Sequence, residues 1–130
     1  MSKKDIESRL HELGIYSNYY YRIELKALSH ILNVDETLNS VVTGVFDGRR
    51  RMIAVTDYRI IIVASGAISA GEVTVIRRDA VKSWKFNKKI LLSSIEIETS
   101  EKTFVFKQTQ AGQKNLFTWA MNQPMKVFDE

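Results

Sequence analysis

The stretch Ile53-Ala54-Val55-Thr56-Asp57-Tyr58-Arg59-Ile60-Ile61-Ile62-Val63 decides the fold of this 130-residue chain. It consists of two short apolar runs, rich in β-branched side chains, on either side of the polar pair Asp57-Tyr58. Apolar runs of this length between turn residues are typical of buried strands. We therefore expect an antiparallel hairpin with strands near Arg50–Thr56 and Arg59–Ser65.

The polar residues at the turn of this hairpin are Thr56, Asp57 and Arg59. Aspartate is favoured in tight turns because its carboxylate accepts hydrogen bonds from nearby backbone amides. An arginine two residues later can pair with that carboxylate locally. We therefore interpret the three residues as a structural turn and not as a chemical site.

Short β-branched runs continue on both sides of the hairpin. From Leu38 onward the apolar residues recur with a period of 2, and glycine, aspartate, asparagine and serine separate the runs. Connections as short as Asp47-Gly48 favour antiparallel pairing of strands that follow one another in the sequence. Besides the two central strands we expect five more, near Leu38–Phe46, Val73–Arg78, Lys82–Phe86, Leu91–Glu98 and Thr103–Gln108.

The N-terminal part has helical periodicity. A first short helix is expected to begin at Ser2, which together with Asp5 resembles a capping box, and to end at Gly14. A second amphipathic helix is expected to begin near Ser17 and to end at Asn33.

The C-terminal part predicts one more helix, capped by Thr109, running to about Asn122 and ended by Pro124. An antiparallel sheet with open ends is naturally covered by such a helix when the helix carries an apolar stripe. The fold class is therefore mainly β (α+β), with two helices, seven strands and one helix in that order.

The composition excludes several classes of protein. With 45% hydrophobic and 26% charged residues, the chain is in the globular range, and its length favours one compact unit. We divide that unit into a helical extension over residues 1–33 and a β domain with its C-terminal helix over residues 34–130. The absence of cysteine excludes disulfides, thiolate metal sites and cysteine nucleophiles. No apolar run approaches the roughly 18 residues of a transmembrane helix, and no export signal is recognisable, so we expect a cytoplasmic protein.

The central hairpin, with its Thr-Asp-x-Arg turn at Thr56–Arg59, resembles the second hairpin of bacterial pleckstrin-homology-like domains of the YokE-like group. Other segments follow in the family's order, namely Leu38–Gly44, Val81–Phe86, Leu91–Thr99, Thr103–Lys107 and the helix from Thr109. The resemblance covers about residues 34–123. It implies a partly open barrel of about seven antiparallel strands in two near-orthogonal sheets, capped at one end by the C-terminal helix. The N-terminal helices then lie outside the common core, and the relatives' oligomers imply self-association.

Two groups of basic residues are candidate anion-binding sites. The formal net charge is +4, and the excess lies after Val41, because the first 40 residues carry five basic and six acidic side chains. Arg49 and Arg51 follow the first hairpin turn and share one face of a strand, so their guanidinium groups could hold a phosphate together. Phosphoinositide-binding relatives carry basic residues in this loop, but the lysine that usually completes their site is missing here. The alternative is a solvated charge cluster that protects a sheet edge.

The second basic group surrounds Trp84 and Phe86 and consists of Arg77, Arg78, Lys82, Lys85, Lys88 and Lys89. Basic side chains with exposed aromatic rings could bind single-stranded nucleic acid. Period 2, however, places Trp84 and Phe86 together on the inward face of a strand and leaves Lys85 outside. We therefore favour solvated lysines around a core strand.

Tyrosines crowd the start of the second helix. Tyr16, Tyr19, Tyr20 and Tyr21 cannot all face one core, because successive helical residues diverge by about 100°. Tyrosine is enriched at protein interfaces, so Tyr16, Tyr19 and Tyr20 are candidates for a protein-contact surface. The equal alternative is that these rings cover the outer wall of the barrel.

The sequence contains no pattern that indicates an enzyme. The two histidines lack metal-ligand spacing, Glu96 and Glu98 alternate with apolar residues as an outward strand face does, and no phosphate loop is present. We expect neither a metal nor a cofactor. The leading hypothesis is a non-catalytic binding or scaffold domain that contacts copies of itself or other proteins through a sheet edge or the tyrosine helix. The alternative is binding of an anionic ligand, a peripheral membrane phospholipid or a nucleic acid, by the basic residues.

Overall fold

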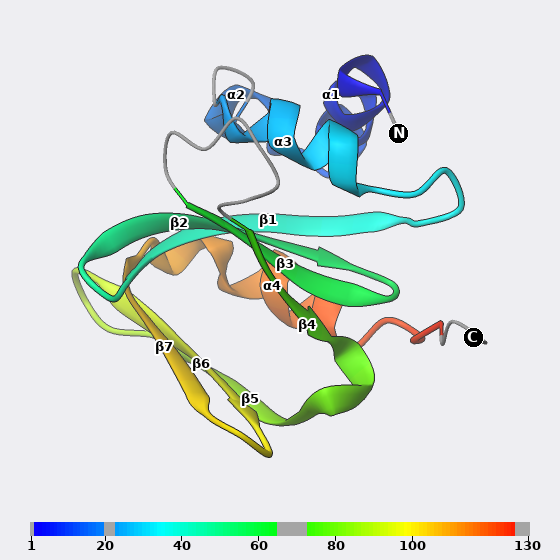
Figure 1. Ribbon diagram of the computed structural model, residues 1–130. Helices are drawn as coiled ribbons and strands as arrows, with labels where there is room; N and C mark the ends of the chain where they lie inside the picture. The colour runs from blue at the N-terminus through cyan, green and yellow to red at the C-terminus, as the bar shows by residue number, and fades with distance from the viewer. Residues whose placement is uncertain (1, 20–22, 65–72, 127–130) are drawn as a thin grey trace.

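The computed structural model describes residues 2–19, 23–64 and 73–126 (Figure 1). The helices are α1 (Lys3–Glu12), α2 (Tyr16–Tyr19), α3 (Glu24–Ile31) and α4 (Lys114–Met121). The strands are β1 (Leu38–Phe46), β2 (Arg49–Thr56), β3 (Arg59–Ala64), β4 (Val73–Arg77), β5 (Val81–Asn87), β6 (Ser93–Thr99) and β7 (Thr103–Thr109). Short 3-10 turns, η2 (Arg78–Ala80) and η3 (Ala111–Gln113), precede β5 and α4. Within these ranges, no helix is long and apolar enough to cross a membrane.

The seven strands form one antiparallel sheet in the order β4-β3-β2-β1-β7-β6-β5. The expected seven antiparallel strands are therefore confirmed. The first four strands and the last three form two halves, which meet where Val45 of β1 pairs with Lys107 of β7. Figure 1 shows the second half folding beneath the first, with α4 enclosed between them. This order leaves β4 and β5 as the two edge strands.

The central strands are buried on both faces. In β3, Ile60, Ile61, Ile62 and Val63 are all at most 2% exposed. Alternate strand residues point to opposite faces, so such a run requires a core on each side of the sheet. Ile61 and Val63 belong to a core shared with α1, α2 and α3, whereas Ile60 and Ile62 belong to a core shared with β5, β6, β7 and α4.

The N-terminal helices cover the outer face of the first half of the sheet (Figure 1). The expected capping box is confirmed, because Ser2 Oγ accepts a hydrogen bond from Asp5 N and the Asp5 side chain accepts one from Ser2 N. α1 ends before Gly14, whose φ of +76° suits a residue without a Cβ. Arg9 Nε donates to the carbonyl oxygen of Leu38 at 2.7 Å, which ties α1 to β1.

The second expected helix differs from the structure, which has α2 and α3 as separate elements. Residues 20–22 and Ser65, which the expected elements included, lie outside the described residues. Ile23 is half-exposed at the start of α3 and makes no side-chain capping bond. The described residues therefore contain two short helices where the apolar period predicts one.

Two other boundaries are corrected. β6 begins at Ser93 and not at Leu91, because the last β5–β6 pair is Asn87 with Ser94 and residues 88–92 lie in the connection. Thr109 does not cap the final helix. It is the last residue of β7, its hydroxyl is buried without a hydrogen-bond partner, and α4 follows Gln113, which makes no side-chain cap.

The two halves of the sheet pack tightly against each other at Gly44. A Cβ built there would lie 2.8 Å from Phe106 Cβ and 2.9 Å from Thr109 Oγ1, both in β7. Since both neighbours are fixed in the core, they cannot move aside without shifting the strand.

We predict that Gly44→Ala lowers the free energy of unfolding by about 1–3 kcal/mol, because overpacking of a core forces backbone shifts. Gly112→Ala is the matched control, since a Cβ at Gly112 would have no atom within 4 Å. It should change stability by less than about 0.5 kcal/mol. Urea unfolding followed by circular dichroism measures both, and equal stability of the two variants would contradict the close approach.

Candidate functional site

The polar residues at the central turn form a buried cluster, not an open site. Thr56 Oγ1 donates to Glu36 Oε2 at 2.6 Å and accepts hydrogen bonds from the amides of Tyr58 and Arg59. Arg59 holds the same carboxylate with two bonds, Nε to Oε2 at 2.9 Å and Nη2 to Oε1 at 2.8 Å. A second bond from Nη2 reaches the carbonyl of Ile31 at 2.7 Å and so fastens the end of α3 to the turn.

Asp57 has different partners from the one expected. Its Oδ1 accepts from the amide of Thr37 at 2.9 Å, and its Oδ2 is 3.1 Å from Lys126 Nζ. The hydrogen bond to Asp57 raises the pKa of the Lys126 amine. The expected local pair between Asp57 and Arg59 is therefore wrong. The guanidinium group of Arg59 binds instead the carboxylate of Glu36, which is distant in sequence. The structural interpretation of Thr56, Asp57 and Arg59 agrees with these contacts.

Arg78 is corrected from a candidate anion-binding residue to a structural one. It is almost completely buried in η2, and its Nη2 donates to the carbonyl of Met121 at 2.7 Å. Its Nη1 lies 3.4 Å from the carbonyl of Thr56. Burial lowers the pKa of Arg78, and the charge of Asp57 opposes that shift. The residue joins the central turn to the end of α4, and only 5% of its surface is exposed.

The remaining arginines have individual environments. Arg77 is exposed at the end of β4 and pairs with Asp79 at 2.7 Å. Arg51 donates to the carbonyl of Phe46 at 3.3 Å, and its guanidinium lies 5.7 Å from the centre of the Phe46 ring. Arg49 is exposed beside the β1–β2 turn. Arg49 and Arg51 are thus close in the hairpin, but Arg51 is held against Phe46.

The lysines of the second basic group all lie at the surface. Trp84 and Phe86 point inward as expected, with ring centres 5.6 Å and 6.1 Å from that of Phe117 in α4. Lys85 points outward and lies 3.0 Å from Glu96, and this bond lowers the pKa of the Glu96 carboxyl. The other exposed members are Lys82, Lys88 and Lys89.

The three candidate tyrosines do not share one surface. Tyr19 is buried in the core between the N-terminal helices and the sheet. Tyr16 is half-buried and stacks on His11 with ring centres 3.8 Å apart. Tyr20 lies outside the described residues. Tyr19 therefore behaves as the alternative interpretation expected, as a ring that covers the sheet.

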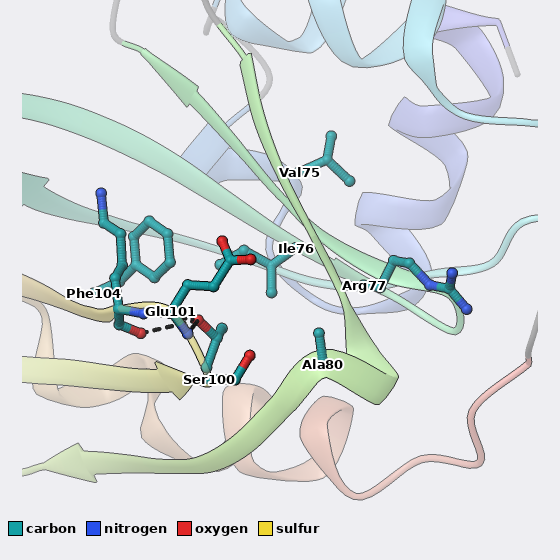
Figure 2. A pocket seen from close by; sticks show the side chains of 9 residues that line it. Val75, Ile76, Arg77, Ala80, Ser100, Glu101 and Phe104 are labelled. Atoms are coloured by element: carbon teal, nitrogen blue, oxygen red, sulfur yellow. Dashed lines mark hydrogen bonds between the residues drawn. The ribbon is translucent and has the colours of Figure 1, made fainter.

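A groove separates the β4 edge from the β6–β7 hairpin. It has a volume of about 250 Å³ and is lined by Val75, Ile76, Arg77, Ala80, residues 99–102 and Phe104. Figure 2 shows Ile76 of β4 on one side, with Phe104 and Glu101 of the hairpin on the other. The lining combines apolar side chains, among them Ile76 and Phe104, with the charged side chains of Arg77, Glu101 and Lys102. Among the described residues, no group of three or more histidine, aspartate or glutamate side chains is placed to hold a metal.

Sequence reasoning missed three features of the structure. Glu36 and Lys126 had no local signal, because their partners lie 23 and 69 residues away along the chain. Residues 90–92 carried a signal that was partly misread. They are three consecutive aliphatic residues after Lys88 and Lys89, and the last two of them were assigned to a strand. The structure places them in an exposed connection instead.

Comparison with known proteins agrees with this architecture. Residues 32–122 match the family described as Bacterial PH domain, and the chain belongs to that family. A similar solved structure is the crystal structure of the C-terminal domain of an unknown protein from Leishmania infantum. It has 18% sequence identity and a TM-score of 0.53, and the match covers 66% of this chain and 81% of that one. At that identity the likeness shows the fold alone. No curated protein gives a significant match.

We predict that Arg78→Gln lowers the free energy of unfolding by about 3 kcal/mol, because two buried carbonyls lose a charged donor. Arg77→Gln is the matched control, because the guanidinium group of Arg77 is exposed. This substitution should change the free energy of unfolding by less than about 0.5 kcal/mol. Chemical denaturation measures both. A small effect of Arg78→Gln would contradict its structural role.

We also predict that Arg59→Met destabilises the fold by about 3–5 kcal/mol, because it leaves the fully buried Glu36 carboxylate without its cation. The double variant Glu36→Gln/Arg59→Met should recover part of that loss, since it removes the unpaired charge as well. The coupling is read from a double-mutant cycle in urea. Additive effects of the two substitutions would show that the pair does not act as a unit.

Proposed function

We propose that this chain is a non-catalytic scaffold domain that binds proteins, and first of all copies of itself, through the free edge of β4. The observation that carries the proposal is the position of β4 at the end of the sheet, where its outer side pairs with no described strand. An edge strand presents unpaired backbone donors and acceptors and can accept a further strand.

The residues of β4 are compatible with self-pairing. An antiparallel pair of β4 strands centred on Val75 would place Val75 opposite its copy and Arg77 opposite Val73. No like charges would then face each other directly. Val75 is already exposed, so a partner strand would cover apolar surface that water now contacts. The groove beside β4 gives room for the partner's side chains along Ile76 and Phe104.

The subgroup of the family and the location of the chain in the cell are also proposals. We place the chain in the YokE-like group of bacterial PH-like domains, supported by the Thr56–Arg59 turn, and in the cytoplasm, supported by the absence of cysteine from the sequence.

A second function, the binding of an anionic ligand, is supported by a separate observation. Between Asp79 and Glu96 the chain carries four lysines and no acidic residue, and all four side chains are exposed. These lysines lie around β5, at the opposite edge of the sheet from β4. The two functions therefore use different surfaces.

We predict that Val75→Lys and Val75→Glu each abolish self-association, because each places two like charges opposite one another at the centre of the paired strands. An equimolar mixture of the two variants should associate again, since lysine then faces glutamate. The solution mass from light scattering across a concentration series, at low salt, measures all three samples.

Val34→Lys and Val34→Glu are the matched controls, because Val34 is 92% exposed and belongs to the connection between α3 and β1. They should keep the mass of the unaltered chain. A chain that stays monomeric at every concentration, or Val75 variants that keep the oligomer, would refute pairing at this edge.

A further inference from the structure

Three consecutive aliphatic side chains project into solvent at the end of the β5–β6 hairpin. Ile90 is 99% exposed, Leu91 86% and Leu92 51%. Single exposed apolar residues are ordinary, but a contiguous exposed group marks a contact surface. We call residues 88–92 the β5–β6 tip.

The core between the two halves of the sheet does not include these side chains. Phe86 before the tip and Ile95 after it are both buried, so the chain leaves the core and returns to it on either side of the tip. The base of the tip is fastened by hydrogen bonds, from Asn87 Nδ2 to Glu96 Oε2 at 3.0 Å and from the amide of Lys89 to Ser93 Oγ at 3.3 Å. The apolar group is therefore held away from the body of the domain.

Positively charged side chains lie next to the apolar group. Lys88 and Lys89 precede it directly, and both are exposed. Below it lies a groove of about 510 Å³, whose lining includes Lys89, Leu92 and Lys107. The one carboxylate in that lining is Glu96, which is occupied by Lys85 and Asn87. The tip and the groove beside it thus combine exposed aliphatic side chains with the three exposed lysines Lys88, Lys89 and Lys107.

We propose that the β5–β6 tip inserts into the surface of an anionic lipid bilayer. Ile90 and Leu91 would enter the boundary between headgroups and acyl chains, while Lys88, Lys89 and Lys107 would contact lipid phosphates. A bilayer offers an apolar layer directly beneath an anionic one, which matches the order of side chains on the tip. A short apolar anchor binds membranes weakly alone, and nearby lysines supply the second signal that it requires.

Other anionic partners fit this surface less well. Single-stranded nucleic acid is bound by stacking of bases on aromatic rings, and the rings of Trp84 and Phe86 are turned inward against Phe117. Aliphatic side chains have no ring face for a base. The inference rests on the second proposed function, anionic-ligand binding, and specifies its ligand as a lipid surface.

The test is co-sedimentation with vesicles of phosphatidylcholine alone and of phosphatidylcholine with phosphatidylglycerol. The unaltered chain should bind the anionic vesicles and lose most binding at high salt. Ile90→Ser/Leu91→Ser should weaken binding at least about tenfold with all charges kept, and Lys88→Ser/Lys89→Ser should weaken it by a similar factor.

Two double variants are matched controls. Val34→Ser/Met125→Ser removes two exposed apolar side chains elsewhere, and Lys3→Ser/Lys4→Ser removes two exposed lysines elsewhere. Both should bind within about twofold of the unaltered chain, since only the tip is expected to enter the bilayer. Unchanged circular dichroism spectra confirm that every variant is folded.

Insertion has its own readout. The fluorescence emission of a Leu91→Trp variant should shift to shorter wavelength on anionic vesicles, and it should not shift with inorganic phosphate or an oligothymidylate. If Lys88→Ser/Lys89→Ser weakens binding but Ile90→Ser/Leu91→Ser does not, insertion is overturned and anionic binding stands. If anionic vesicles recover no protein at low salt, this inference fails, and anionic binding stands only if the oligothymidylate is bound instead.

Discussion

The burial of the central strands on both faces is the constraint on which the rest of the structure depends. A strand such as Ile60 to Val63, with every side chain apolar, cannot leave either face in water. One face is covered by α1, α2 and α3, and the other by α4 and the strands β5, β6 and β7. The N-terminal helices are therefore part of the core that the hairpin requires, although the family match begins after them at Leu32.

Buried charges fix how these layers meet. Glu36, Thr56 and Arg59 join the end of α3 to the central turn, and Arg78 joins the same turn to the end of α4. Each charged group has a partner, as burial in a medium of low polarity demands. The guanidinium groups of Arg59 and Arg78 are engaged in these contacts. The number of basic residues in the sequence is therefore larger than the number that a ligand can reach.

The two proposed contact surfaces lie at different parts of the sheet. The β4 edge offers unpaired backbone with Val75, and the β5–β6 tip offers aliphatic side chains above lysines. These edges differ in chemistry, because one has little charge and the other has charge of one sign. A domain that joins its copies at one edge and contacts a lipid surface at the other would gain avidity, since each contact raises the local concentration for the next.

The sequence by itself determined the elements whose signal is local: the central hairpin, the strand count, the antiparallel order and the capped first helix. It also placed Trp84 and Phe86 inward, because period 2 reports the face of a residue. Only the tertiary structure decided which charges are buried, since the partners of Arg59, Asp57 and Arg78 come from distant segments. It likewise decided that residues 90–92 are exposed, because composition alone cannot distinguish a buried strand from an apolar connection. The last pair between β5 and β6 is Asn87 with Ser94, so residues 90–92 lie beyond the paired strands.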